Sequence, residues 1–286
     1  MSVDELIILV FACIYSIKSL SGWYGKIPGA GPVSRDKTTK YVMCLLPVAS
    51  FFIILYTLLA LASFDVVNSF IYILFYILLG YTWTFLGMKL VFIFFDISWI
   101  DDVLSLNNKA ALCAVSGAFL GLVTIYSGAN VGDGPGWWCV VFAGGLGLVS
   151  WYILARIVNA FTEVFERITI DRDIYCGIRF GAYLLASGII MARASAGDWT
   201  SFSSTIVEFM VGWPVLPLTV IVILVERYYI RKARMGESVN NTYLFGSLYW
   251  GIVYIIIAVV SAAVFPLVEN PIYDSVSAIF TSGAVL

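Results

Sequence analysis

Long apolar runs separated by short polar segments dominate the chain from end to end. Each run holds about 20 residues with few charges, and an α-helix of that length crosses the hydrocarbon core of a bilayer. The strand-like alternation over about ten residues that marks a membrane barrel is absent from the sequence. Because lipid cannot satisfy an open backbone, the pattern predicts an all-α integral membrane protein. The eight runs expected to span cover residues 6–23, 41–63, 69–90, 109–127, 137–159, 175–195, 204–226 and 243–265.

Composition supports this class. Of the 286 residues 61% are hydrophobic and 12% are charged, against about 25% charged in soluble domains. The apolar stretch of the first run, Leu6–Ile17, is short; it follows Asp4 and Glu5 and ends at Lys18. A cleaved signal peptide would have basic residues in front of its apolar stretch. We therefore expect a short first spanning helix, and all 286 residues to form a single polytopic membrane domain.

The basic residues fall on one side of the predicted membrane. Of 16 Lys and Arg, Arg193 alone lies toward the even-numbered connections. Because basic residues stay in the cytoplasm, the odd-numbered connections are predicted to be cytoplasmic and both termini outside. The residues on that side are Lys18, Lys26, Arg35, Lys37, Lys40, Lys89, Lys109, Arg156, Arg167, Arg172, Arg179, Arg227, Arg231, Lys232 and Arg234.

Two segments of the chain resemble each other at an offset of about 64 residues. The sequence from Gly117 matches that from Gly181, and the pair Gly132-Asp133 recurs as Gly197-Asp198, one residue out of step. Small residues let helices pack closely, so we expect contacts at Gly117, Gly121, Gly181 and Gly188. Chance matching of Gly and Ala in apolar helices is the alternative explanation.

The similarity predicts tandem helical-hairpin repeats over about 36–95, 103–167 and 168–234. Each repeat crosses twice, so successive copies keep one orientation and would be related by an axis along the membrane normal. Helix 243–265 lacks a partner in this scheme. It could pair with helix 6–23 or with the C-terminal tail.

The second helix of the later repeats is interrupted near its middle. The sequences are "AGGLG" with Gly144, Gly145 and Gly147, and "GWPVLP" with Pro214 and Pro217. Gly and Pro weaken or remove backbone hydrogen bonds, and interrupted helices at matching repeat positions point to a membrane binding site. Close helix packing for the glycines and a structural kink for the prolines are the alternatives.

The stretches "NNKAALCAVSGAFLGLVTIYSGA" and "RDIYCGIRFGAYLLASGIIMARASAGDW" resemble the paired-helix repeat of the YjfL-like family of bacterial inner-membrane proteins, a domain of unknown function (350). The likeness covers roughly residues 70–230. The matching positions are Arg172, Asp173, Gly181, Gly188, Gly197 and Asp198, whereas the first copy has Asn107-Asn108-Lys109 in place of the charged entry. Many relatives are shorter. The resemblance implies a bacterial inner membrane and supplies no activity.

Little in the sequence indicates catalysis. The chain has no His, the commonest general base and metal ligand. Its five Cys show no C-x-x-C spacing, so we expect neither a disulfide framework nor a metal site. The stretch "GDGPGWW" is explained by a turn and interfacial Trp residues. We therefore expect no enzyme activity and no cofactor. We also expect no nucleic-acid partner, because no basic stripe with interleaved aromatics occurs.

Two charged features remain as candidates. Arg193 and Glu208 lie at matching depths of an antiparallel hairpin, so they form an ion pair or each reaches the interface separately. Two further charged segments are the mixed-charge segment 163–173 and the basic segment 226–237. Such segments are typical of solvated helix ends or of docking surfaces for a cytoplasmic partner.

Two classes of function stay open. The first is a transporter- or channel-type subunit for a small cation or small solute. Its path would be lined near Glu208, Trp213, Thr219 and Gly144–Gly147. The second is a non-catalytic membrane scaffold that forms homo-oligomers and recruits partners in envelope stress or membrane remodelling. A path predicts polar residues facing one another at the midplane, and a scaffold predicts apolar packing there.

Overall fold

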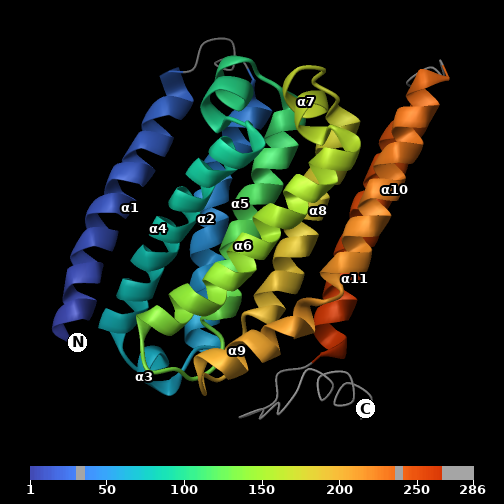
Figure 1. Ribbon diagram of the computed structural model, residues 1–286. Helices are drawn as coiled ribbons and strands as arrows, with labels where there is room; N and C mark the ends of the chain where they lie inside the picture. Colours follow the sequence, from blue (N-terminus) through green and yellow to red (C-terminus); the bar gives the residue numbers. More distant parts are fainter. Residues whose placement is uncertain (30–35, 236–240, 266–286) are drawn as a thin grey trace.

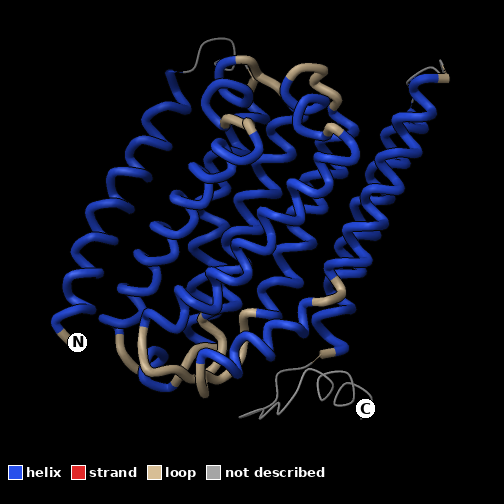
Figure 2. Tube along the Cα trace, viewed as in Figure 1, coloured by secondary structure: helices blue, strands red, loops and turns tan. Residues whose placement is uncertain are grey.

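The computed structural model describes residues 1–29, 36–235 and 241–265. Helices joined by short loops make up this part of the chain (Figure 2). Eight of them are long and apolar enough to cross a membrane, which confirms an all-α, multi-pass membrane protein. The elements are α1 (Val3–Gly29), α2 (Lys37–Ala60), α3 (Phe64–Val67), α4 (Phe70–Phe95), the π-helix η2 (Trp99–Ser105), α5 (Lys109–Ala129), α6 (Trp137–Thr162), α7 (Val164–Thr169), α8 (Ile174–Ala194), α9 (Phe202–Phe209), the 3₁₀ turn η3 (Met210–Gly212), α10 (Val215–Arg234) and α11 (Asn241–Val264).

The long helices run in two opposite directions (Figure 1). Helices α1, α4, α6 and α10 begin at the end of the bundle that holds α3 and α9, here called the α3 end. Helices α2, α5, α8 and α11 begin at the opposite, α7 end. Within this second set α5 packs most closely against α8, and α8 packs next most closely against α11. The parallel pair α5–α8 is therefore the centre of the bundle.

Glycines bring the backbones of α5 and α8 into direct contact. A Cβ atom on Gly117 would lie 2.0 Å from the carbonyl oxygen of Gly181, and one on Gly181 would lie 2.3 Å from that of Cys113. Further along, a Cβ on Gly188 would lie 2.6 Å from Cα of Gly121. Residues of any other type would push the helices apart. The four glycines expected to serve packing lie at this contact.

The starts of α2, α5 and α8 share one local structure. Each begins after a polar residue, Asp36, Asn108 or Asp173, whose side chain accepts hydrogen bonds from the amides two and three residues on. Asn or Asp at this position satisfies amides that have no partner within the helix. The residues that precede Asn108 and Asp173 have left-handed backbone conformations, with φ of 49° at Asn107 and 53° at Arg172. These recurring starts fit the repeat; a rotation relating whole hairpins stays a prediction.

Adjacent repeats are also joined through these starts. The ammonium group of Lys109 forms an ion pair with Asp36, and this hydrogen bond lowers the pKa of the Asp36 carboxyl to about 2. The side-chain amide of Asn108 donates from Nδ2 to the carbonyl oxygen of Ile168 at 2.7 Å. The polar entries predicted from the sequence thus connect one hairpin to the next.

The edges of the bundle differ from expectation. Helix α1 extends to Gly29, beyond the expected end at 23, and packs against α4 and α2. Helix α11 packs against α8 and α10 at the opposite edge (Figure 1). The two helices suggested as partners, 6–23 and 243–265, thus cover different sides of the central helices. The rival partner, the C-terminal tail, lies outside the described residues.

Candidate functional site

The seventh span is broken at Pro214, but local backbone hydrogen bonds satisfy the carbonyl groups at the break. Helix α9 ends in the turn η3, and α10 starts after Pro214. The amide of Trp213 donates to the Met210 carbonyl at 3.0 Å, and the amide of Leu216 donates to the Trp213 carbonyl at 3.0 Å. These are the carbonyls that Pro214 and Pro217 leave without their usual helical donors. No additional side chain, water or ligand is needed to satisfy these two carbonyls.

The other predicted lining residues do not converge on this break. Trp213 is 40% exposed and stacks edge-on against Phe265. Pro217 is exposed in the first turn of α10, where proline is tolerated. Gly144 packs against Trp83 and Gly147 lies close to Ser195, whereas a Cβ on Gly145 would meet nothing within 4 Å. Packing accounts for Gly144 and Gly147.

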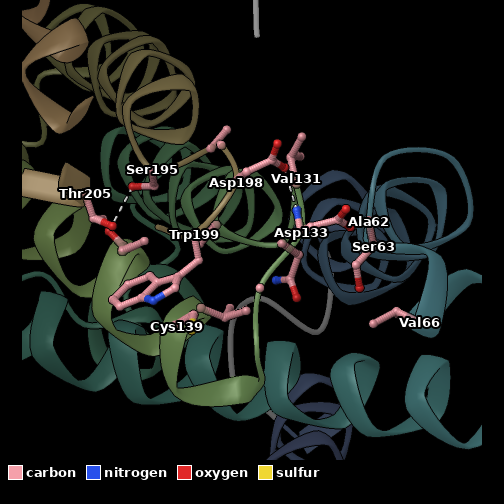
Figure 3. Close-up of a pocket in the computed structure, with 18 of the residues that line it drawn as sticks. Ala62, Ser63, Val66, Val131, Asp133, Cys139, Ser195, Asp198, Trp199 and Thr205 are labelled. Atoms are coloured by element: carbon pink, nitrogen blue, oxygen red, sulfur yellow. Dashed lines mark hydrogen bonds between the residues drawn. The ribbon is translucent and has the colours of Figure 1, made fainter. Parts of the chain in front are cut away.

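The two Gly-Asp pairs recognised in the sequence meet at the α3 end. Gly132 and Gly197 have φ values of 103° and 141°, in the left-handed region that glycine tolerates. The amide of Asp133 donates to the carboxylate of Asp198 at 2.8 Å, while the carbonyl of Asp133 accepts from the amide of Trp199 at 2.7 Å. Figure 3 shows Asp133 and Asp198 lying close together in this pocket. The paired turns form one wall of it.

The pocket encloses about 50 Å³ beside these turns and is closed by the start of α6 and by α9. That volume suits one or two water-sized groups. Its lining includes hydroxyl groups and three carboxylates. The polar residues among the lining are Ser63, Tyr76, Asn130, Asp133, Ser195, Asp198, Thr205 and Glu208.

Glu208 is the most unusual residue of the pocket. It is 9% exposed, and its Oε1 is buried without a hydrogen-bond partner among the residues that the structure describes. The other oxygen, Oε2, lies 3.8 Å from the position of a Cβ on Gly197, so the carboxylate faces the Gly-Asp turn. A buried carboxylate oxygen without a partner is costly. This oxygen is therefore the best-defined place for a ligand at the α3 end.

The charges around Glu208 favour a bound cation only weakly. Asp198 adds negative charge nearby and Arg193 adds positive charge. Arg193 donates to the carbonyl oxygens of Phe265 and Ala196, and among the described ion pairs within 4 Å there is none between Arg193 and Glu208. No three acidic or thiol side chains in the described ranges converge as a metal site. The pocket fits a single small cation or a proton.

Further polar residues line the interface of α8 with α10. The hydroxyls of Tyr183 and Thr219 lie 3.0 Å apart and both residues are buried. Thr219 was among the predicted lining residues, and the structure pairs it with a residue that the sequence did not single out for this role. Glu226 follows Thr219 by seven residues, two helical turns, and lies on the same buried face.

Glu226 is the centre of a buried ion-pair network. Its carboxylate accepts from Arg179 Nη2 at 2.8 Å and from Arg167 at 2.7 Å. Arg167 also pairs with Asp173 at 2.7 Å, and Arg179 donates to Ser247 of α11 at 2.6 Å. The network connects α7, α8, α10 and α11. Sequence reasoning missed it, because the seven-residue spacing from Thr219 shows only that Glu226 shares its face of α10.

We define the α8–α10 seam as Thr219 and Glu226 of α10 with the facing residues Tyr183 and Arg179 of α8, and we include Glu208 of α9 at its α3 end. It holds a buried carboxylate toward each end and a hydroxyl pair between them. Thr219 and Glu226 are separated by about 10 Å along the helix. Apolar residues such as Val222 fill that interval.

Comparison with known proteins gives a family and no activity. The family described as Domain of Unknown Function (DUF350) matches residues 64–194, somewhat less than half of the chain. No curated protein and no solved structure matches the chain. The matched region is shorter than the resemblance noted over 70–230. It contains Gly132-Asp133 but not Gly197-Asp198, Glu208 or Glu226. The segment from the start of α3 to the end of α8 is thus the part of this chain that is similar to the DUF350 family.

Proposed function

We propose that the protein is a transporter- or channel-type membrane protein for a small monovalent cation or a proton. The observation that carries the proposal is Glu208, whose buried Oε1 lacks a partner in a pocket with two further carboxylates. Ionisable groups within membrane helices mark ion and proton pathways more often than they mark simple structure. A cation or a proton would satisfy this oxygen.

The seam supplies the rest of the route. From Glu208 the ion would pass the Tyr183–Thr219 hydroxyl pair and reach the Arg179–Glu226 network toward the α7 end. Polar residues that face one another between the ends of the spans are what a path requires. Apolar packing separates the three positions, so passage needs movement. The break between α9 and α10 is a natural hinge for such movement.

The test compares the parent protein with Glu208→Gln in proteoliposomes. Proton, Na⁺ and K⁺ gradients are imposed in turn, and internal dyes record flux. We expect Glu208→Gln to reduce flux of the conducted ion at least tenfold, because the amide has no charge. Asp65→Asn, which removes an exposed carboxylate at the same end outside the pocket, is the matched control and should conduct normally.

A second pair of variants tests the seam at its middle. Tyr183→Phe and Thr219→Val each remove one hydroxyl of the buried pair and should slow flux without preventing assembly. If the parent conducts none of the three ions under any gradient, the transport proposal is wrong. If Glu208→Gln conducts like the parent, Glu208 is not on the path.

The alternative is a scaffold that forms oligomers and recruits partners. It is favoured by the backbone contact between α5 and α8 at Gly117 and Gly181, which seals the centre of the bundle. The self-satisfied turn at Met210–Pro214 also suits a structural kink. In this case cytoplasmic partners would dock at 163–173 and at 226–237, of which the last two residues lie outside the described part of the chain.

We also propose a location and an orientation. The sequence resemblance supports a bacterial inner membrane. Of the described Lys and Arg, only Arg193 lies in the half of the bundle nearer the α3 end (Figure 1). The positive-inside rule then favours a cytoplasmic α7 end, with both termini outside. The Glu208 pocket would thus open toward the exterior, and Glu226 would lie on the cytoplasmic side.

A further inference from the structure

A groove of about 700 Å³ lies between α1 and α4 near the α7 end, and η2 closes it. Helices α1 and α4 run in the same direction and pack side by side (Figure 1). The groove is separate from the Glu208 pocket, which shares none of its lining residues. Its size falls in the range of sites that hold organic ligands.

Three lysines line the groove: Lys18 and Lys26 from α1 and Lys89 from α4. In the described ranges none of them has a carboxylate partner within 4 Å. Asp101 is the one acidic residue among the lining residues described, and the Ser98 hydroxyl donates to it at 2.9 Å. The groove therefore carries a net positive charge without an internal counter-ion for each lysine.

Aromatic and apolar side chains form the walls. Lys26 lies 5.6 Å from the ring centroid of Trp99, and Lys89 lies 5.0 Å from that of Tyr15. Trp23 and Trp99 stack at 4.2 Å. Two of the three lysines, Lys26 and Lys89, thus lie over aromatic rings that line the groove.

The groove is continuous with surface that faces lipid. Phe92 and Ile93 line it and are themselves exposed on α4. Helix α1 buries little of its apolar span inside the protein, so acyl chains cover its outer face in a bilayer. Toward the midplane the groove reaches Tyr15, which stacks on the exposed Phe11 of α1. A ligand in this groove would therefore contact charge toward the α7 end and hydrocarbon toward the midplane.

We infer that this groove binds an anionic phospholipid, with its phosphate among Lys18, Lys26 and Lys89 and its acyl chains running toward the midplane along Tyr15 and Phe11. Basic pockets between membrane helices recognise anionic headgroups, and the aromatic rings suit the headgroup level of the bilayer. A zwitterionic lipid would leave the three ammonium groups without net compensation. Simple snorkelling of each lysine would give no preference between lipids.

The test is native mass spectrometry of the detergent-purified full chain titrated with phosphatidylglycerol or phosphatidylcholine. We expect the parent to bind phosphatidylglycerol at least roughly tenfold more tightly, given the contribution of each basic residue near a membrane surface. The triple variant Lys18→Gln, Lys26→Gln, Lys89→Gln should lose this preference. The matched triple variant Lys37→Gln, Lys40→Gln, Lys232→Gln removes the same charge outside the groove and should keep it.

A second variant removes the space and keeps the charge. Gly22 lines the groove and a Cβ there would meet nothing within 4 Å, so Gly22→Phe should fold and should weaken phosphatidylglycerol binding. The inference is wrong if the parent shows no preference, or if both triple variants lose it equally. It is also wrong if millimolar glycerol 1-phosphate or inorganic phosphate displaces the lipid, since the site would then take free phosphate.

Discussion

At the scale of single residues, two buried glutamates differ in their hydrogen-bond partners. Glu226 has three hydrogen bonds from two arginines and is completely buried. Glu208 is almost as buried, yet one of its oxygens has no partner. A buried charge is stable only when its partners are present. Glu226 is therefore suited to hold helices together, and Glu208 to bind something that the protein does not itself supply.

The stability of the bundle should depend on Glu226. Glu226→Gln leaves Arg179, which is 1% exposed, without compensation for its charge. We expect a loss of about 3–5 kcal/mol in the free energy of unfolding, as for other broken buried pairs. Unfolding monitored by circular dichroism in detergent measures this loss.

Two comparisons make that measurement specific. Glu166→Gln removes an exposed carboxylate at the same end and should change stability little. The double variant Arg179→Met, Glu226→Leu should recover most of the loss, because apolar residues can replace a buried pair. Equal stability of Glu226→Gln and the parent would contradict a structural role for the network.

At the scale of helices, the α5–α8 contact leaves no room for side chains. A Cβ on Gly117 would lie 2.0 Å from a backbone oxygen of Gly181, which cannot move without its helix. We expect Gly117→Ala to reduce the free energy of unfolding by about 1–3 kcal/mol, as overpacking does. Gly145→Ala on α6, where nothing lies within 4 Å, is the control and should stay within about 0.5 kcal/mol of the parent. If the two variants have the same free energy of unfolding, the α5–α8 contact at Gly117 contributes little to stability.

The helices themselves could be predicted from the apolar runs, because a span needs only length and few charges. The Gly-Asp turns and the packing glycines were also visible as repeats. The Arg179–Glu226 pair was not, since its members are 47 residues apart and meet only through the packing of α8 on α10. Pro47 was overlooked for a similar reason. The Met43 carbonyl that it leaves free accepts from the indole of Trp23 on α1, at 2.8 Å.

For the whole molecule, charge divides the two ends of the bundle. The described basic residues other than Arg193 lie toward the α7 end, whereas acidic residues lie at both ends, for example Asp4 and Asp133 at the α3 end and Asp101 and Asp173 at the α7 end (Figure 1). The two ends of the seam also differ. Oε1 of Glu208 has no partner among the described residues, and Glu226 near the other end is bound by arginines. Orientation in the membrane therefore decides which solution each site meets.

Cysteine labelling tests that orientation directly. The native cysteines at 13, 44, 113, 139 and 176 are first replaced by Ala, and one new cysteine is added as Gly134→Cys or as Lys37→Cys. Both positions are exposed, and they lie at opposite ends of the bundle, in the loop before α6 and at the start of α2. Because basic residues remain in the cytoplasm, a membrane-impermeant maleimide added to intact cells should label only the cysteine at 134. The cysteine at 37 should react only after the membrane is opened. Labelling at 37 in intact cells would reverse the proposed orientation, and it would place the Glu208 pocket on the cytoplasmic side.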